Sequence, residues 1–436
     1  MNVAMRLARP NVKFGHQHPE TTHGVACKCL SCCSSRRDRA AALSLWTSGS
    51  RSTRHEATCA CARCSSPSSS STSSSSSSRR SGLSPLRAAA EGQRVGVGTE
   101  IAAATATEKV VEEALKYKAT LGNGFSMHAP MVALALSRLG ATETQILEQF
   151  EAAREKQKRY KWLSIEGEEE ETTSIGEENW KLHVNDTGEN ENAFRAFFRS
   201  GQQDAVVQEV LKYTASGVHS RLHHGVIRLA YAMEMEMDEE IVAALAAITT
   251  NYKSMPRVSR EESARDLAEA MDKIQKMHST LKSKPMGMGK KYTNYLGDSS
   301  IVSKIPDVQD LSSNLSQFVA VVVRLYLLTP NIFTLHMITG LHALLVLESH
   351  FGDSFDEALK SHYTSVAAMY LAVKCPDIFS KVPDIKWRTW DELRAHVFMT
   401  KNDHDIKFVD TCLYLSNRFP ELAHEIQLAA STLKKK

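Results

Sequence analysis

The sequence predicts an all-α protein, a single large multi-helix domain preceded by a disordered N-terminal leader. Apolar residues recur at helical spacing through residues 105–433. Alternating runs bounded by Gly or Asn turns, which indicate β-hairpins, do not occur there. Residues 1–90 are instead rich in Arg and Ser and poor in acidic residues. Such a segment cannot bury enough apolar surface to fold.

The leader also differs from the body in charge. Residues 1–90 hold 13 basic and 3 acidic residues, a charge of +10, so the rest of the chain carries −7 of the total +3. An Arg-rich, Ser-rich and acid-poor leader is typical of a transit peptide for the chloroplast or mitochondrion; without such import we expect a cytoplasmic protein. The mildly acidic body argues against nucleic-acid binding.

Cysteine usage points to a reducing compartment. Seven of the nine cysteines lie in the leader, and only Cys375 and Cys412 lie in the body, so we expect no disulfide framework there. The leader motifs CKCLSCC and CACARC lack the paired spacing of a zinc site, so zinc is not favoured.

The body divides into helices separated by turn signals. Thr residues mark two N-termini, Pro130 is tolerated in a first turn, and Gly140 ends a helix. The segment 165–178 reads as an acidic loop, and 282–300 as a second loop. The predicted helices are 105–117, 126–139, 142–161, a segment leading to 198, 204–215, 218–237, 238–250, 261–281, 308–328, 332–350, 354–374, 389–400, 402–417 and 421–433.

Residues 320–347 are apolar enough to raise the question of a membrane span. Arg324, Pro330 and Asn331 interrupt the stretch, whereas a span needs about 20 consecutive apolar residues. We therefore expect two core helices joined by a TPN turn, and no membrane span.

The segment 221–237, RLHHGVIRLAYAMEMEM, is apolar on nearly every side and should form a buried helix. His224, Ile227, Arg228 and Tyr231 share one of its faces. The helix therefore carries an imidazole and a guanidinium into the interior, where each must find a partner.

Other histidines lie in similar surroundings, namely His128, His336, His342 and His404. A lone buried histidine usually bonds to a backbone carbonyl. Several on separate helices could instead converge on a metal, because neutral imidazole suits iron, copper and zinc. His336 and His342 are six residues apart and point about 120° from each other, so they should not share one site unless Gly340 distorts the helix. His404 and Lys407, three apart, can reach a common point.

Six blocks in order resemble the questin oxidase-like family over residues 110–428. They are FSMHAPMVALALSRLGAT, FRAFFRSG, HHGVIRLAYAME, FTLHMITGLHALLVL, SHYTSVAAMYLA and DHDIKFVDTCLYL. The resemblance implies an oxygenase that opens anthraquinone-type rings and is described as Baeyer–Villiger-type and NADPH-requiring. It also implies a non-haem iron centre built from histidines and a lysine carboxylated by carbon dioxide. By position, the ligands would be His128, His224, His336 or His342, His404 and Lys407.

These residues can perform that chemistry. A lysine in a dry site has a depressed pKa and can add carbon dioxide, which supplies a hard oxygen ligand. Asp403 and Asp405 could orient His404 or Lys407, and Arg228 could pair with the carbamate or hold a substrate oxygen. The candidate catalytic residues are Arg228, Tyr231 and Asp403, and the candidate pocket walls are Phe125, Phe194, Tyr231 and Phe333.

Three hypotheses follow. The first is a metal-dependent oxygenase that cleaves an aromatic or quinone-type substrate with dioxygen. The second is an NADPH-dependent or cofactor-free Baeyer–Villiger-type monooxygenase in which the histidines are general acids and bases. No GxGxxG motif supports a nucleotide site, so NADPH rests on the resemblance alone. The third is a non-catalytic helical interaction protein, which predicts that the histidines lie apart.

Overall fold

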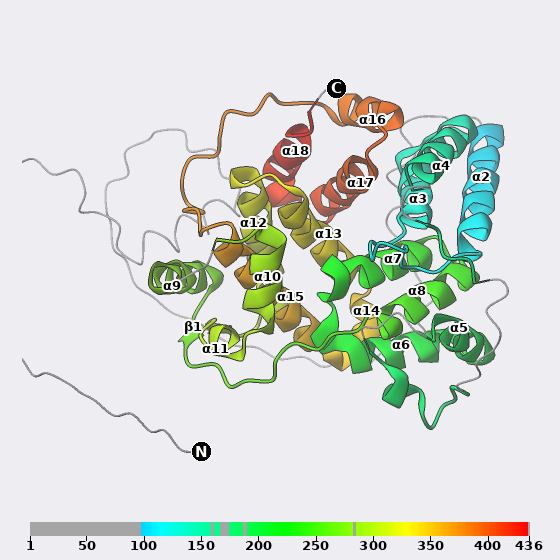
Figure 1. Cartoon of the computed structure of the whole chain (residues 1–436). Helices are drawn as coiled ribbons and strands as arrows, with labels where there is room; N and C mark the ends of the chain where they lie inside the picture. Colours follow the sequence, from blue (N-terminus) through cyan, green and yellow to red (C-terminus); the bar gives the residue numbers. More distant parts are fainter. Residues whose placement is uncertain (1–96, 158–160, 166–173, 186–189, 282–284, 435–436) are drawn as a thin grey trace, which may run out of the picture.

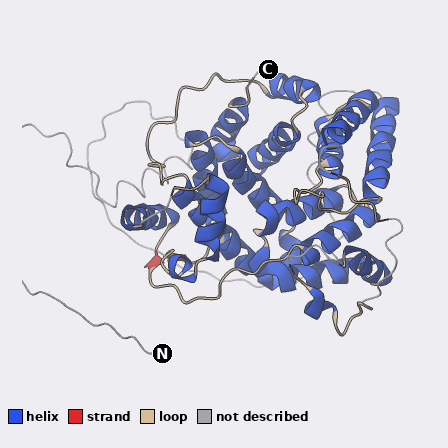
Figure 2. Ribbon diagram, in the orientation of Figure 1, coloured by secondary structure: helices blue, strands red, loops and turns tan. Residues whose placement is uncertain are grey.

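The computed structural model describes residues 97–157, 161–165, 174–185, 190–281 and 285–434, and it confirms the all-α class (Figures 1 and 2). The predicted leader, its Cys motifs and most of the acidic loop lie outside the described residues. In the described part, the only strands are β1 (Ser263–Ala264) and β2 (Asp307–Val308), a short parallel pair with Ser263 opposite Asp307.

The helices follow the predicted order with shifted ends. They are α2 (Val97–Leu115), α3 (Ala129–Leu139), α4 (Glu143–Gln157), α5 (Glu191–Ser200), α6 (Gln203–Thr214), α7 (His224–Glu234), α8 (Asp238–Thr250), α9 (Leu267–Thr280), α10 (Met288–Gly297), α11 (Ser299–Val302), α12 (Leu315–Leu328), α13 (Ile332–Val346), α14 (Glu348–Phe351), α15 (Phe355–Ala372), α16 (Trp390–Met399), α17 (Asp403–Arg418) and α18 (Ala423–Ser431).

Four helices form a closed frame at the centre of the molecule. Helix α3 packs against α7 and α17, and α13 packs against the same two helices from the other side. Figure 1 shows α2 and α4 flanking this frame at one end and α9, α10 and α11 at the other. The frame helices are apolar on most faces because they are buried, as the near-continuous core of α13 illustrates.

Two predicted boundaries are wrong for identifiable reasons. The segment 282–300 is not one loop, since it contains α10 and the start of α11. Helix α10 forms there because its tyrosines Tyr292 and Tyr295 are buried in the core. The helix expected over 218–237 is broken, because Arg221, Leu222 and His223 adopt left-handed backbone angles with φ of 48°, 55° and 67°. Helix α7 therefore begins only at His224.

The apolar stretch at 320–347 forms α12 and α13, joined by the expected TPN turn. In the described part of the chain no single helix is long and apolar enough to cross a membrane. Helix α13 together with Glu348–Ala372 passes that test as a pair bent by 66°.

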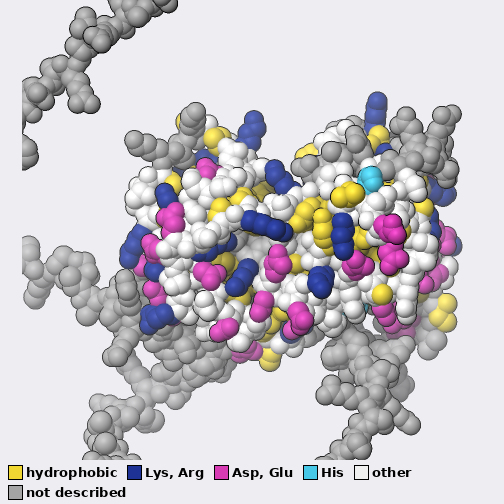
Figure 3. Space-filling model, turned by 90° about the horizontal axis from the view of Figure 1, so that it is seen from below, with side chains coloured by type: hydrophobic (Ala, Val, Ile, Leu, Met, Phe, Trp, Pro, Cys, Tyr) yellow, Lys and Arg dark blue, Asp and Glu magenta, His cyan; other side chains and the backbone are white. Residues whose placement is uncertain are grey.

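Charged side chains are mixed by sign on the face shown in Figure 3, where Lys and Arg lie among Asp and Glu. This face therefore offers no continuous basic stripe of the kind that nucleic acids bind.

Gly340 does not distort α13, which continues past it to Val346. Its role is to make room for a neighbour, since a Cβ at this position would lie 2.6 Å from Cγ of His223. The absence of a side chain thus lets the strained 221–223 segment pack directly against α13.

We predict that Gly340→Ala destabilises the protein by about 1–3 kcal/mol, because overpacking a closed core forces the backbone or the His223 ring to move. Urea unfolding followed by circular dichroism measures this change. Gly297→Ala is the matched control, because it is also helical and a Cβ there meets nothing within 4 Å. Equal stabilities for the two variants would contradict the packing role of Gly340.

Candidate metal centre

Each helix of the frame contributes one histidine to a common point. His128 is the N-cap of α3, His224 is the first residue of α7, His336 lies in the second turn of α13, and His404 lies in the first turn of α17. Their rings are neighbours, with centroids 4.9 Å apart for His128–His224, 4.7 Å for His224–His336, 4.7 Å for His128–His404 and 5.1 Å for His336–His404.

The ring nitrogens converge more closely than the centroids. Nε2 of His224 lies 2.8 Å from Nε2 of His128 and 3.3 Å from Nε2 of His336. Potential ligand atoms of His128, His224 and His404 all lie within 4.8 Å of one another. These three imidazoles could hold one small ion, and His336 borders them through its contact with His224.

Backbone carbonyls fix the protonation of two of these rings. Nδ1 of His224 lies 2.5 Å from the carbonyl oxygen of Arg221, and Nδ1 of His336 lies 2.6 Å from that of Ile332. A carbonyl oxygen only accepts hydrogen bonds, so both Nδ1 atoms must carry the proton and donate it. Each Nε2 is therefore an unprotonated lone pair aimed at the cluster.

Two lone pairs that face each other at 3.3 Å repel, because neither His224 nor His336 has a proton to place between them. A cation removes this conflict. Two ligands with metal–imidazole bonds of about 2.0–2.1 Å are separated by about 2.9 Å at a right angle and about 3.4 Å at a tetrahedral angle. The observed separations of 2.8 and 3.3 Å are close to these values, so the Nε2 atoms of His128, His224 and His336 fit a metal ion.

Asp403 lies at Nδ1 of His128, the position that a backbone carbonyl occupies at His224 and His336. Its Oδ2 lies 3.4 Å from Nδ1 of His128, and both side chains are buried. A carboxylate at Nδ1 favours the tautomer that leaves Nε2 unprotonated, as is usual for histidines that bind metals. Asp403 therefore acts on His128, and its charge also raises the pKa of Lys407, one of the two partners that we predicted for it.

Lys407 lies on the next turn of α17 and is 2% exposed. Its Nζ has no hydrogen-bond partner among the described residues. Burial lowers the pKa of Lys407 to about 8, although the charge of Asp403 opposes this shift. The amine is close enough to the cluster that its charge lowers the pKa of His224, His336 and His404.

Burial keeps the cluster neutral. It lowers the pKa of His336 to about 3, and it lowers the pKa of His224 and of His404 well below the usual histidine range. Neighbouring rings and Lys407 lower them further, since a second positive charge nearby is unfavourable. Neutral imidazole is the form that binds metals.

His342 and Tyr231 lie elsewhere in the frame. Nδ1 of His342 is 3.2 Å from Oγ1 of Thr411, and its ring packs on Tyr414 and Tyr231. Tyr231 is buried beside Asp410, and burial raises its pKa well above the usual value. Of the two histidines predicted as alternatives, only His336 joins the cluster, because α13 is regular and turns His342 away.

Arg228 and Asp405 have partners that we did not predict. Arg228 forms a buried bidentate ion pair with Glu240 of α8, with Nε and Nη2 at 2.5 and 2.8 Å from its oxygens. The predicted pairing of Arg228 with a carbamate, or with a substrate oxygen, stays a prediction. Asp405 accepts a hydrogen bond from Nδ2 of Asn402 at 2.5 Å and faces His396, away from the cluster.

The predicted aromatic walls are scattered. Phe125 is 68% exposed, Phe194 is fully buried against Phe198, and Phe333 lies beside Gly289. None of them, nor Tyr231, lines the pocket that opens beside α7.

Several residues in and around the histidine cluster were not predicted from the sequence. The carbonyls of Arg221 and Ile332 give no sequence signal beyond their spacing of three and four residues before a histidine. A second buried pair, His223 Nε2 with His362 Nδ1 at 2.9 Å, lies behind the cluster. Glu240 was detectable in principle, as an acidic residue at the start of an otherwise apolar helix.

The fold and the site define a class: an all-helical protein with four histidines gathered where four helices meet, three of which could hold a metal ion. The sequence model of the questin oxidase-like family matches residues 125–412, which is more than half of the chain, and the chain belongs to this family. Membership indicates an oxidoreductase that acts on aromatic ring compounds. No curated protein matches the chain.

Acid should unfold this protein in a way that its histidines determine. The unfolded chain takes up protons near pH 6.5, whereas the buried histidines resist protonation, so the unfolding free energy must fall as the pH drops below about 6.5. Each such histidine contributes up to about 1.4 kcal/mol per pH unit. Those with lowered pKa are His219, His223, His224, His336, His342, His362 and His404.

Urea unfolding of chelator-treated protein at pH 7.5, 6.5 and 5.5 measures this slope. His219→Gln, outside the cluster, should make the slope shallower by about one proton. An unfolding free energy that does not change between pH 7.5 and 5.5 would contradict the neutral state of these rings.

Proposed function

We propose that the protein is an oxygenase that uses dioxygen to cleave an aromatic or quinone-type ring at a non-haem iron centre. The ligands are His128, His224, His336 and His404, together with a carboxylated Lys407. The single observation that supports this best is the convergence of unprotonated Nε2 atoms that carbonyls hold in place. The same convergence counts against a non-catalytic role, which predicts histidines that lie apart.

The ends of four helices surround the cluster, and this has an electrostatic consequence. Each candidate ligand lies within the first two turns of its helix, where the dipole is positive. Four neutral imidazoles do not offset this field, so a bound cation needs an anionic ligand nearby. Asp403 supplies one negative charge and a carbamate on Lys407 supplies a second.

Carboxylation of Lys407 is chemically balanced. The lone pair of the neutral amine forms a bond to the carbon of carbon dioxide, and the nitrogen loses one proton, which leaves a carbamate anion. With a pKa of about 8, about half of the amine is neutral at pH 8. The orphaned Nζ has no competing hydrogen bond to break among the described residues.

Iron bound here would supply open positions for dioxygen and the capacity to change its oxidation state. The protein's own contribution is positional. The carbonyls of Arg221 and Ile332 keep two rings in one tautomer, Asp403 holds the proton of His128 Nδ1, and the apolar frame keeps bulk water away. The use of NADPH as electron donor and import into an organelle stay predictions from the resemblance and from the leader.

We expect the isolated protein to contain about one transition-metal ion per chain, and His224→Gln to lose it, because this change removes the central Nε2 ligand. Elemental analysis by mass spectrometry measures the content. His342→Gln is the matched control, a buried histidine of the same frame that lies outside the cluster. A folded wild-type protein without metal, or equal metal content in the two variants, would refute the centre.

We also expect a carbamate carbon resonance in the ¹³C NMR spectrum of protein equilibrated with labelled bicarbonate. Lys407→Met should abolish the resonance, whereas the exposed Lys401→Met should leave it unchanged. Loss of the carbamate should also lower the affinity for metal by at least about tenfold, the range seen when one supporting group is removed. A resonance that persists in Lys407→Met would place the carbamate elsewhere.

A further inference from the structure

The segment of residues 221–223, directly before α7, carries the group that sets the tautomer of His224. Its first residue, Arg221, supplies the carbonyl oxygen that accepts the proton of His224 Nδ1 at 2.5 Å. The carbonyl reaches the ring because Arg221, Leu222 and His223 all adopt left-handed backbone angles. Such angles are unfavourable for residues with a side chain, so tertiary contacts must hold the segment in place.

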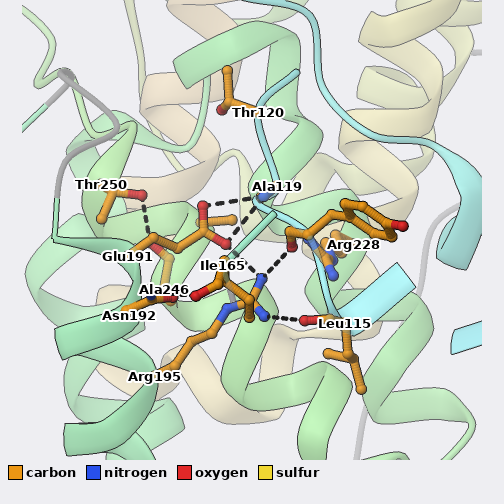
Figure 4. Close-up of polar contacts among 12 residues, drawn as sticks. Leu115, Ala119, Thr120, Ile165, Glu191, Asn192, Arg195, Arg228, Ala246 and Thr250 are labelled. Carbon is orange, nitrogen blue, oxygen red and sulfur yellow. Dashed lines mark hydrogen bonds and ion pairs between the residues drawn. The ribbon is translucent and has the colours of Figure 1, made fainter. Parts of the chain in front are cut away.

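The rest of α7 is fixed by contacts of its own. Just after the first turn of the helix, Arg228 forms its buried ion pair with Glu240 of α8. Figure 4 shows Arg228 near a second buried pair, Glu191 with Arg195, which ties α5 to backbone groups of the connection between α2 and α3. These bonds hold the body of α7, so the place of the Arg221 carbonyl depends on what anchors the segment before it.

His223 is the buried anchor of the 221–223 segment. Arg221 is exposed, and its side chain donates only a long hydrogen bond, 3.3 Å, to the carbonyl of Gly124. Leu222 is partly buried and offers apolar contact alone. His223 is 0% exposed, and its ring packs so closely on α13 that a Cβ at Gly340 would lie 2.6 Å from its Cγ.

His362 of α15, a helix outside the four-helix frame, holds the His223 ring. Its Nδ1 lies 2.9 Å from Nε2 of His223, so one nitrogen donates and the other accepts. Both rings are fully buried, so breaking this bond leaves two polar groups in the interior, which is unfavourable. Phe318 packs edge-on against His362, and the preceding residue, Ser361, donates to the carbonyl of Ser216 in the same part of the chain.

The hydrogen bond of His362 therefore acts on His224 through a short backbone path. The ring of His223 and the carbonyl of Arg221 belong to one three-residue segment, so releasing the ring lets the segment relax and the carbonyl move. The proton of His224 can then shift to Nε2, which lies 2.8 Å from Nε2 of His128 and could donate to it. That shift would remove the lone pair that faces the cluster.

We propose that His362 is a positioning residue for the histidine cluster. By bonding to His223 it keeps residues 221–223 in their left-handed conformation, and so keeps the carbonyl of Arg221 at Nδ1 of His224. The proton then stays on Nδ1, and Nε2 stays free to bind a metal ion. The relevance of His362 to catalysis rests on the proposed metal centre, but its effect on the tautomer of His224 does not.

The tautomer of His224 can be measured without any metal. Long-range ¹H–¹⁵N NMR of the full, chelator-treated chain with labelled histidine shows which ring nitrogen carries the proton, and His224→Gln assigns the signals. We expect protonation at Nδ1 in the wild type. His362→Leu fills a similar volume without a hydrogen bond and should move most of the population to the form protonated at Nε2. His362→Asn places an amide near the position of Nδ1 and should restore the wild-type tautomer.

Two further measurements follow the same variants. Amide hydrogen exchange in the peptide 219–225 should be at least about tenfold faster in His362→Leu, because one buried hydrogen bond no longer holds the segment closed. Titration of the chelated chain with cobalt(II), followed by absorbance, should show at least about tenfold weaker binding. His342→Leu is the matched control: it also removes a buried histidine and its hydrogen bond, and it should change none of the three readouts.

A wild-type His224 protonated at Nε2 overturns the proposal, whatever the variants do. Equal behaviour of His362→Leu and His362→Asn, or the same shift in His342→Leu, also overturns it. If His362→Leu does not fold, His362→Gln takes its place, because its amide lies near the position of Nε2 instead and cannot replace the bond.

The two proposals fail separately. A tautomer that shifts with His362 in a chain that binds no cobalt supports the positioning role and refutes the metal centre. Cobalt binding with a tautomer that is the same in every variant keeps the metal centre and overturns the role of His362.

Discussion

The hydrogen bonds from two histidine Nδ1 atoms to backbone carbonyls are the constraint on which the centre depends. The carbonyl of Arg221 reaches His224 because three consecutive residues adopt left-handed angles, each of which costs roughly 1–3 kcal/mol outside glycine. The carbonyl of Ile332 reaches His336 because Asn331 caps α13 and fixes where that helix begins. Strain on one side and a regular cap on the other thus produce the same chemical result, a lone pair directed inward.

Charge balance accounts for where the charged side chains lie around the histidine cluster. A neutral cluster at four positive helix ends leaves room for added negative charge, which Asp403 already begins to provide. Deeper in the molecule, the charges cancel in pairs, Arg228 with Glu240 and Arg195 with Glu191. These pairs give little net stability, because removing each ion from water offsets its attraction, but they fix geometry around the pocket.

The helices could be predicted because apolar periodicity is local, and the four histidines could be singled out because they interrupt apolar runs. The choice of His336 over His342 could not be made, since it depends on how α13 is rotated against α7 and α17. Arg228 was correctly placed on the face of His224, but its partner Glu240 lies on another helix that the face does not identify. The break before His224 also escaped prediction, because left-handed angles at Leu222 and His223 depend on tertiary packing, such as that of His223 against Gly340.

The same four helices carry a second polar cluster about two to three turns beyond the histidines. Arg138 of α3 forms ion pairs with Glu234 and with Asp410, and Tyr231 and His342 pack beside them. Arg138 balances the charge of one carboxylate here, and burial raises the pKa of Asp410, which favours the neutral form of the second. One end of the frame thus holds a permanent cation among carboxylates, while the other presents imidazole nitrogens, the amine of Lys407 and the single carboxylate of Asp403. At the histidine end, a metal ion would supply the positive charge and a carboxylated Lys407 the negative charge. At the other end, Arg138 and its carboxylates already supply both.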